Sequence, residues 1–589
     1  MGFSTAGTVL VLAVGAISCT GGDAGVPVHG TVATVTAALT SDPSNERLEG
    51  SFTLALAAGT EGSDDAEVGS FDFMLTGEDG MPLGGVTAAS DAVFPIVMKP
   101  GTSARVHYTF TADSPLPPPP DLGGWCRGPW LVQPSGTLGG TTDATLYGSP
   151  DVFLPSITVE RTSPLQAPDL GAIGPRRLTS GANKVTQGLA LDAAGNTVMS
   201  LADVTSGFPV PALMTKLDPS GSPLWTRDLF AAGQLFSAAV AAGGDVEAMA
   251  GSFTGEIDLG DGPVSDASQG AYVARLGAGG EALWSRQVHD DNGVDVQGIE
   301  VGASGNVLLA ANGFAGSVQV MIGSQVETID PDPGGPAGSP FGVLVAFGPA
   351  GDYLFGKALP ALVEAFAVDA SGSMVLAGSF QGTVDFGGGP LVGSAGSLNL
   401  WIARLDAAGQ HVWSRRYEGS TIVSALEVGS GGEILLTART VDDTIDFGGG
   451  PLGGAGSSFI VAKLDPEGGH LWSKRFSELA FDVNVALAVD DAGRVFLSGS
   501  TNGPVQFGVA ELPNAAEFAL YAAQLDPSGE EVRAGFFGCS NGHVPALAYR
   551  RGVSPDVALA ATFRRIASLA GEQLATGAID DVIVARHAP

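Results

Sequence analysis

The stretch LDAAGQHVW (residues 405–413) decides the fold, because related copies of it recur along most of the chain. The copies share an apolar residue, then Asp or Gly, then Gly three positions later, and most have an aromatic residue eight positions after the first. Their first residues, Leu217, Leu276, Phe347, Leu405, Leu464 and Leu525, lie 59, 71, 58, 59 and 61 positions apart. Without the 12-residue insertion Ile329–Pro340, the longest interval becomes 71 − 12 = 59. A constant pitch of about 60 residues indicates a repeated supersecondary unit.

Within a unit the pattern is β throughout. Residues 486–500 (ALAVDDAGRVFLSGS) alternate as a strand, an Asp-x-x-Gly turn and a second strand. The Asp side chain can bond its own backbone two residues on, and Gly accepts the positive φ that closes the turn. Consecutive hairpins of four short strands per unit predict propeller blades, and each blade needs neighbours to cover its two faces.

The ends of the repeated region complement each other. Residues 580–589 (DDVIVARHAP) match the third strand of a unit, and no fourth strand follows. Residues 174–178 (GPRRL) resemble the fourth strand at 413–417 (WSRRY). We therefore expect 172–179 to pair with 580–587 and to complete the last blade, which leaves no open edge in the ring. Units that begin near residues 183, 236, 296, 363, 423, 484 and 544 predict seven blades.

The units resemble the bacterial seven-bladed β-propeller repeats called SBBP-type. The resemblance lies in the segments 378–391 (GSFQGTVDFGGGPL) and 441–452 (VDDTIDFGGGPL) and in the strands that follow them, and it covers about 170–587. It implies a propeller fold and an exported lipoprotein, but it brings no catalytic residues with it. Residues 217–225 (LDPSGSPLW) also resemble the tryptophan-docking repeat of quinoprotein-type propellers.

Residues 28–162 lack the repeat. Segments such as 51–58 (SFTLALAA) and 104–112 (ARVHYTFTA) alternate apolar and polar side chains, so Val106, Tyr108 and Phe110 should face a core. Several such strands predict an immunoglobulin-like β-sandwich. The expected fold is therefore all-β: a smaller sandwich at 28–162, followed by a seven-bladed propeller at 163–589.

The N-terminal residues have the pattern of an export signal. Residues 8–18 (TVLVLAVGAIS) are apolar but too few to span a bilayer, which is typical of a signal peptide. Residues 16–19 (AISC) resemble a bacterial lipobox, which implies a signal peptide at 1–18, lipidation of Cys19 and a tether at 19–27. We expect an outer-membrane lipoprotein or cell-surface protein of the cell envelope, with a secreted protein as the alternative.

Composition excludes several classes of function. The chain has 62 acidic and 27 basic residues, a net charge of −35, so a basic nucleic-acid-binding surface is not expected. In an oxidising compartment Cys126 and Cys539 could form a disulfide, or they could remain two independent thiols. The sequence has no CxxC or HExxH motif, no phosphate loop and no Cys/His cluster, so neither a metal nor a cofactor is predicted.

Most recurring side chains have a structural explanation. The repeated Asp residues should stabilise turns, the Trp residues should pack between blades, and the basic residues two positions after them should lie along the aromatic rings. His411 and His470 hold equivalent places, which indicates repeat ancestry rather than catalysis. The exception is the innermost-strand column, which reads Ala190, Ala239, Glu300, Ala367, Glu427, Ala488 and Ala548.

Glu300 and Glu427 are the candidate site residues. They could converge on a cation or act as an acid/base pair, or they could simply line a hydrated tunnel. The even repetition favours a non-catalytic envelope binding or scaffold protein whose loops, especially the insertion at 329–340, meet a protein or glycan partner. It would be a monomer that meets the membrane only through its lipid anchor. The alternatives are a propeller enzyme that acts on surface glycans, as a lyase or hydrolase, and an outer-membrane assembly scaffold like the quinoprotein-type propellers.

Overall fold

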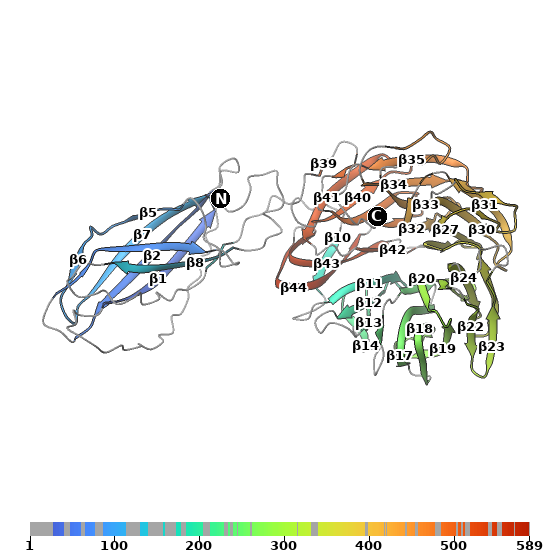
Figure 1. Cartoon of the computed structure of the whole chain (residues 1–589), viewed down its shortest axis with the longest axis horizontal. Coiled ribbons are helices and arrows are strands. Elements are labelled where there is room, and N and C mark those ends of the chain that lie inside the picture. Colours follow the sequence, from blue (N-terminus) through green and yellow to red (C-terminus); the bar gives the residue numbers. More distant parts are fainter. Residues whose placement is uncertain are drawn as a thin grey trace. The chain divides into compact units, whose positions relative to one another are not determined.

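The computed structural model describes residues 28–39, 47–60, 65–76, 86–113, 130–139, 157–159, 172–177, 184–203, 212–228, 234–235, 239–243, 246–259, 262–314, 316–331, 340–394, 398–417, 419, 421–441, 444–453, 457–476, 485–501, 505–507, 511–512, 519–539, 545–550, 556–569 and 572–587. All regular elements among them are strands, so the fold is all-β. In this part of the chain we find no helix with the length and apolar character needed to cross a membrane. The chain divides into two compact units, Met1–Pro164 and Leu165–Pro589 (Figure 1).

The first unit is built from antiparallel sheets with buried aromatic side chains. In sheet order the strands are β1 (Val28–Leu39), β2 (Arg47–Ala58), β7 (Ser103–Asp113) and β5 (Thr87–Ser90); β4 (Ser70–Thr76), β8 (Trp130–Gly139) and β9 (Ile157–Val159); and β3 (Ala66–Val68) with β6 (Ile96–Met98). Val106, Tyr108 and Phe110 on β7 are buried, as predicted, and the Tyr108 ring stacks on Phe52 with centroids 4.9 Å apart. A buried face on this sheet supports the predicted β-sandwich.

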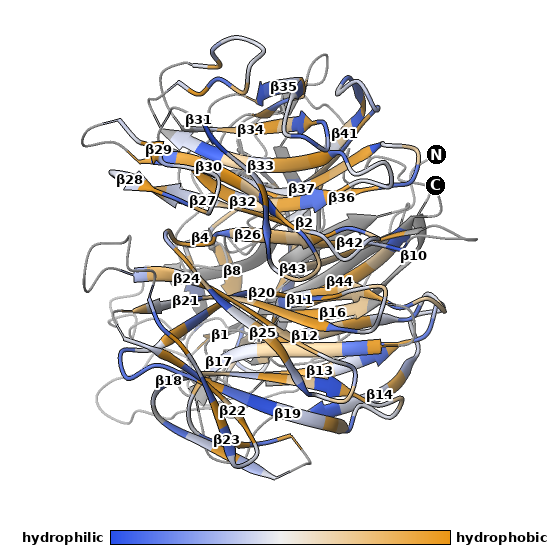
Figure 2. Ribbon diagram, turned by 90° about the vertical axis from the view of Figure 1, so that its right-hand side faces the viewer, coloured by the Kyte–Doolittle hydropathy of each residue, from blue (hydrophilic) through white to orange (hydrophobic). Residues whose placement is uncertain are grey.

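The second unit repeats a four-stranded antiparallel set, in which each strand pairs with the next strand of the same set along the chain. The sets are β11 (Lys184–Leu191), β12 (Thr197–Asp203), β13 (Ala212–Leu217) and β14 (Pro223–Asp228); β16 (Ala239–Gly243), β17 (Val246–Asp258), β18 (Pro263–Leu276) and β19 (Ala282–His289); β20 (Val294–Val301), β21 (Val307–Phe314), β24 (Pro340–Phe347) and β25 (Tyr353–Leu359); β26 (Ala365–Val368), β27 (Met374–Phe380), β30 (Asn399–Leu405) and β31 (His411–Tyr417); β32 (Thr421–Val428), β33 (Ile434–Val441), β34 (Ser457–Leu464) and β35 (His470–Phe476); and β36 (Ala486–Val489), β37 (Val495–Thr501), β40 (Ala519–Leu525) and β41 (Glu531–Cys539). The first halves of β33 and β37 are apolar and buried, and much of the ribbon of this unit is hydrophobic (orange in Figure 2).

The last set combines the two ends of the unit. It contains β42 (Ala546–Arg550), β43 (Asp556–Leu569), β44 (Glu572–His587) and β10 (Ala172–Arg177). β10 pairs antiparallel with β44, with Ala172 opposite His587 and Arg177 opposite Ile583, which is the pairing that the sequence predicts for 172–179 and 580–587. In Figure 1 β10, early in the colour scale, lies beside the red β44.

The first strand of each set contacts the first strand of the next set. β11 contacts β16, and the contacts continue through β20, β26, β32 and β36 to β42, which in turn contacts β11. The first and last sets are also joined by hydrogen bonds from Thr186 N to Thr562 Oγ1 (3.0 Å) and from Arg550 Nη1 to Ala193 O (3.2 Å). One apolar cluster spans the same junction; its members are Met199, Leu201, Leu217, Ala560, Val582 and Val584.

Extra strands extend some of the sets. The hairpin of β22 (Val318–Ile322) and β23 (Gln325–Ile329) follows β21 in the chain, but its strand β22 pairs with β19 of the preceding set. The smaller additions are β15 (Gln234–Leu235), which pairs with β17, and the hairpins of β28 (Thr383–Val384) with β29 (Leu391–Val392) and β38 (Val505–Gln506) with β39 (Glu511–Leu512). Of the predicted insertion at 329–340, residues 332–339 lie outside the described part.

The Asp-x-x-Gly hairpins have the predicted turn chemistry. In the turn after β30, Asp406 Oδ1 accepts hydrogen bonds from the backbone N–H groups of Ala408 (2.9 Å) and Gln410 (2.8 Å). Gly409 closes this turn with a φ of +76°. Asp218, Asp465 and Asp526 accept the same pair of backbone bonds in their own turns. The repeated Asp residues therefore stabilise turns, as the sequence predicts.

In five of the sets the fourth strand has an aromatic residue that packs on the turn of the next set. Trp413 lies over Gly468, where a Cβ atom would come within 2.9 Å of the indole, and its Nε1 donates to Pro466 O at 3.0 Å. Equivalent glycines lie under the other aromatic rings; the pairs are Trp225–Gly280, Trp284–Gly351, Phe355–Gly409 and Trp472–Gly529. The predicted packing of the Trp residues between sets is confirmed.

The basic residue two positions further on reinforces this contact. Arg286 Nε donates to Gly351 O at 2.8 Å, and Lys357 Nζ donates to Gly409 O at 2.8 Å. The Arg286 guanidinium lies 5.4 Å from the Trp284 ring centroid, as expected for a cation beside an aromatic face. These cations are therefore used in contacts between neighbouring sets.

Candidate functional site

The two predicted glutamates lie on first strands of their sets. Glu300 is on β20 opposite Leu308, and Glu427 is on β32 opposite Leu435. Both are half-buried. The strand β26 stands between β20 and β32 in the series of contacts, so the two glutamates belong to alternate sets.

A second polar column, which the sequence analysis missed, lies three residues before the first. The pairing registers of β11, β20 and β32 each skip one residue, which leaves Gln187, Gln297 and Ser424 as β-bulges. Glu364 precedes Ala367 by the same three positions. Bulges re-aim side chains and often border functional sites. We therefore take the three bulged residues together with Glu364, called here the bulge set, as the candidate site. Their common spacing from the first column is a signal that the sequence does contain.

Glu364 is the most constrained member of the bulge set. Its Oε2 accepts a hydrogen bond from Val423 N at 2.7 Å, and its Oε1 accepts one from the Ser379 hydroxyl. Burial raises the pKa of Glu364 despite these bonds. Burial likewise raises the pKa of Asp295, which accepts a hydrogen bond from Gln297 Nε2 at 2.8 Å. Burial that raises the pKa of a carboxyl favours its protonated form, which can donate a proton.

Of the three predicted cysteine sites, only Cys539 lies among the described residues. Cys19 and Cys126 lie outside the described residues, and Cys539 ends β41 opposite Ala519. Across the described ranges, no three His, Cys, Asp or Glu side chains are grouped so that they could hold a metal ion. The pairing of Cys126 with Cys539 and the lipidation of Cys19 stay predictions.

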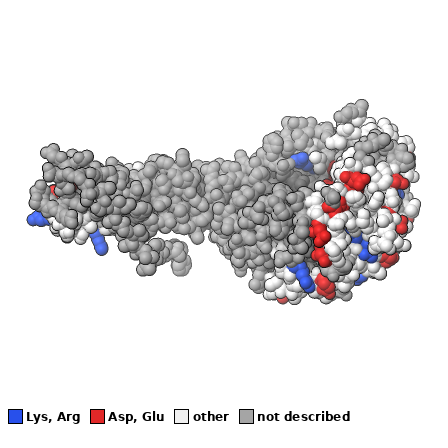
Figure 3. Space-filling model, turned by 60° about the horizontal axis from the view of Figure 1, so that its bottom comes forward, with Lys and Arg blue, Asp and Glu red and all other residues white. Residues whose placement is uncertain are grey.

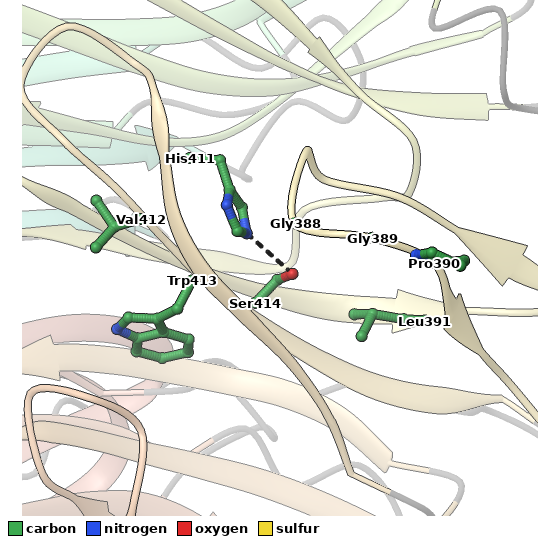
Figure 4. Close-up of a pocket in the computed structure, with 8 residues that line it drawn as sticks. All are labelled: Gly388, Gly389, Pro390, Leu391, His411, Val412, Trp413 and Ser414. Carbon is green, nitrogen blue, oxygen red and sulfur yellow. Dashed lines mark hydrogen bonds between the residues drawn. The ribbon is translucent and has the colours of Figure 1, made fainter.

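An open hollow of about 470 Å³ lies where β31 meets the loop 388–391 (Figure 4). His411 Nε2 is 3.1 Å from Ser414 Oγ, and a Cβ atom on Gly388 would overlap the imidazole. Burial, followed by the charge of Lys357, lowers the pKa of His411. His470 repeats the arrangement in the next set, 3.0 Å from Ser473 Oγ. The repetition supports the interpretation of both histidines as structural.

A buried ion cluster joins the first two sets. Lys216 Nζ lies 2.8 Å from Asp192 Oδ2 and also bonds Glu247, and all three residues are buried. Burial opposes ionisation of Asp192, but hydrogen bonds from Lys216 and Asn196 lower its pKa overall. Burial raises the pKa of Glu247, whose Oε2 has no hydrogen-bond partner. The three side chains are at least nine-tenths buried and bond one another, so we interpret the cluster as a packing contact between the two sets.

The outer surface is rich in acidic groups. Asp and Glu side chains gather on the face of the second unit shown in Figure 3. The carboxylates of the turns are engaged by backbone N–H groups, and hydrogen bonds led by Ser528 lower the pKa of Asp526. Such a surface suits partners that are neutral or basic.

No protein-family model and no curated protein matches the chain. Among solved structures, it is similar to an ulvan lyase described as a new family of polysaccharide lyase (9% identity, 69% of this chain, 96% of that chain, TM-score 0.37). It is also similar to a protein of unknown function from Bacteroides caccae (10% identity, 62% and 98%, TM-score 0.30) and to puromycin hydrolase (12% identity, 65% and 59%, TM-score 0.28). TM-scores this low bear neither on the chemistry of this chain nor on the details of its fold.

Proposed function

We propose that the second unit is a closed seven-bladed β-propeller, and that the chain is an envelope lipoprotein that binds a protein or glycan partner without catalysis. The ring is supported by the series of contacts from β11 to β42 and back, and by the bond from Thr186 to Thr562. In this proposal β10 completes the last blade and the first unit is an immunoglobulin-like sandwich. Lipidation of Cys19 would tether both units to the outer membrane.

One observation carries the choice of binding over catalysis. The side chains that recur in most units have structural roles. The aromatic ring packs on a glycine of the next unit, cations such as Arg286 and Lys357 bond that glycine's carbonyl, and Asp stabilises the turn within its own unit. What varies is the connection between second and third strands, which leaves each sheet at the end opposite the Asp-x-x-Gly turns. A rigid ring can present such connections to a partner at little structural cost.

Site-specific photo-crosslinking in intact cells tests this proposal. The crosslinking residue is placed at Val392 or Val326, exposed on such connections, and for comparison at Ala407 in a turn at the opposite end. We expect one partner to be captured from the connections and none from Ala407. Equal capture from both ends would refute recognition by the connections. Cys19→Ala protein should appear in the culture medium if the anchor is correct.

The raised pKa values of Glu364 and Asp295 favour a second candidate, a propeller enzyme that acts on surface glycans as a lyase or hydrolase. In this case Glu364, with Glu300 and Glu427, would supply the acid and base at the centre of the ring. A screen of glycan degradation decides between the two candidates. Turnover that disappears in Glu364→Gln, Glu300→Gln or Glu427→Gln would establish the enzyme and overturn the binding proposal.

A further inference from the structure

A histidine lies between two carboxylates where the hairpin of β22 and β23 joins β19. His289 Nδ1 is 2.8 Å from Asp266 Oδ2, and His289 Nε2 is 3.3 Å from Asp291 Oδ1. The Asp266 side chain is fully buried, whereas that of Asp291 is 96% exposed. A neutral imidazole can donate from one nitrogen only and presents a lone pair at the other. The contacts with Asp266 and Asp291 can therefore both be attractive at the same time only when the ring is protonated.

The buried carboxylate has no other cation to balance it. Asp266 Oδ1 accepts hydrogen bonds from the backbone N–H and hydroxyl of Ser268, and Oδ2 accepts one from Gln287 Nε2 at 2.8 Å. No Lys or Arg of the described part forms an ion pair with it. These bonds stabilise the carboxylate, and the imidazolium of His289 supplies the counter-charge.

The other charged groups around His289 are also acidic. In the turn, Asp290 is occupied by the backbone N–H groups of Asn292 and Phe314. The hairpin places Gln319 opposite His289, and its carboxylates are Glu327, opposite Val320, and Asp330, which accepts a bond from Ser317. Partial burial alone would lower the pKa of His289, but bonding and attraction from Asp266, then Asp291, raise it overall.

The cluster is physically linked to the hairpin. Asp290 follows His289 directly and accepts the N–H of Phe314 at 3.0 Å, at the end of β21 where the chain leaves for the hairpin. A Cβ atom on Gly316 would lie 2.7 Å from Asp290 Oδ1, so the segment crosses close to the turn. Val320 packs in the same buried cluster as Val288. Loss of the proton from His289 would therefore affect the junction where β19 pairs with β22.

We propose that Asp266, His289 and Asp291 form a pH-sensitive clasp, which holds the hairpin of β22 and β23 on β19 while the imidazole is protonated and loosens it as the pH rises. Because folding raises the pKa of His289, its stabilising contribution is complete below the unfolded value of about 6.5. The contribution is lost as pH increases through the higher value of the folded state. The clasp would regulate how firmly the exposed strand β23 is presented, whether the ring binds partners or acts as an enzyme.

Hydrogen exchange on the full-length protein tests the clasp. The opening equilibrium of amides 318–329 is measured from pH 5.5 to 8.5, after correction for intrinsic exchange rates. We expect it to rise about tenfold, in line with the loss of one charge-assisted hydrogen bond. His289→Gln should abolish this dependence, because glutamine does not titrate. His411→Gln, a histidine paired with Ser414 in another set, should leave it unchanged.

Two outcomes would overturn the proposal. One is an opening equilibrium in the natural protein that does not change with pH, or that changes equally in His289→Gln. The other comes from NMR of the imidazole ring, which needs no variant to fold. If the His289 ring titrates below the midpoint of an unfolded peptide, or at a pH unrelated to hairpin opening, the clasp does not exist.

Discussion

Replacement of Gly468 by alanine should loosen the packing of Trp413 between two neighbouring sets. The backbone φ of Gly468 is +79°, and an added Cβ would lie 2.9 Å from both Arg415 Nε and the Trp413 indole. The left-handed conformation costs alanine about 1–2 kcal/mol. Overlap with the Trp413 indole, which packs against this turn, adds about 1–3 kcal/mol. We therefore expect Gly468→Ala to lower the free energy of unfolding by about 2–5 kcal/mol.

Gly382 provides a matched control for this change. Its φ is +77°, but nothing lies within 4 Å of its added Cβ, so Gly382→Ala carries only the conformational cost. Urea unfolding followed by circular dichroism measures both variants. The difference between their losses isolates the contact with Trp413 and should be about 1–3 kcal/mol. It should shrink when Trp413→Ala is the background, because the clash is then relieved. Equal losses for Gly468→Ala and Gly382→Ala would refute the docking argument.

Three further changes test buried polar groups. Tyr521→Phe removes a hydroxyl without a hydrogen-bond partner, so the thermal midpoint should hold or rise; a fall would contradict this. Lys216→Met should cost about 3–5 kcal/mol at pH 7, as unpaired carboxylates stay buried. In the natural protein, the contribution of Asp192 to the free energy of unfolding should be lost as pH falls through its lowered pKa. Urea midpoints measured over a pH series check this loss and the effect of Lys216→Met. Because the pKa of Glu364 is raised, its ionisation opposes folding as pH rises above the unfolded value of 4.5. Glu364→Gln should flatten this fall of stability with pH, and an unchanged slope would argue against it.

The repeat allows much of the second unit to be predicted from sequence. A fixed interval between identical turn residues implies identical hairpins, and Asp406 and Gly409 have the turn roles that their chemistry predicts. The join between β10 and β44 was predictable because each end of the region lacks what the other supplies. Turn residues that recur at a fixed interval can thus be recognised in the sequence without knowledge of contacts between distant residues.

The candidate site was less predictable, because it depends on register and on neighbours. Gln297 owes its position to one unpaired residue in β20, and nothing local distinguishes a bulge from continuous strand. Glu364 bonds Val423 of the next set, a contact that spans units. The clasp at His289 likewise depends on β22 crossing to a sheet that precedes it in the chain. Such features depend on strand register and on contacts between sets, and the repeat pattern shows only the common spacing of the bulge set from the first column.

The pairing of β10 with β44 has a consequence for biosynthesis. Among the described strands of its unit, Ala172–Arg177 is the first along the chain and is made first, yet its partner Glu572–His587 is the last. During translation, therefore, β10 has no strand to pair with until β44 has been made. The unit cannot reach its full stability before that point. A circular permutant that moves residues 165–179 behind the C-terminus would make these partners neighbours, and it should refold faster than the natural order because the loop to be closed is shorter.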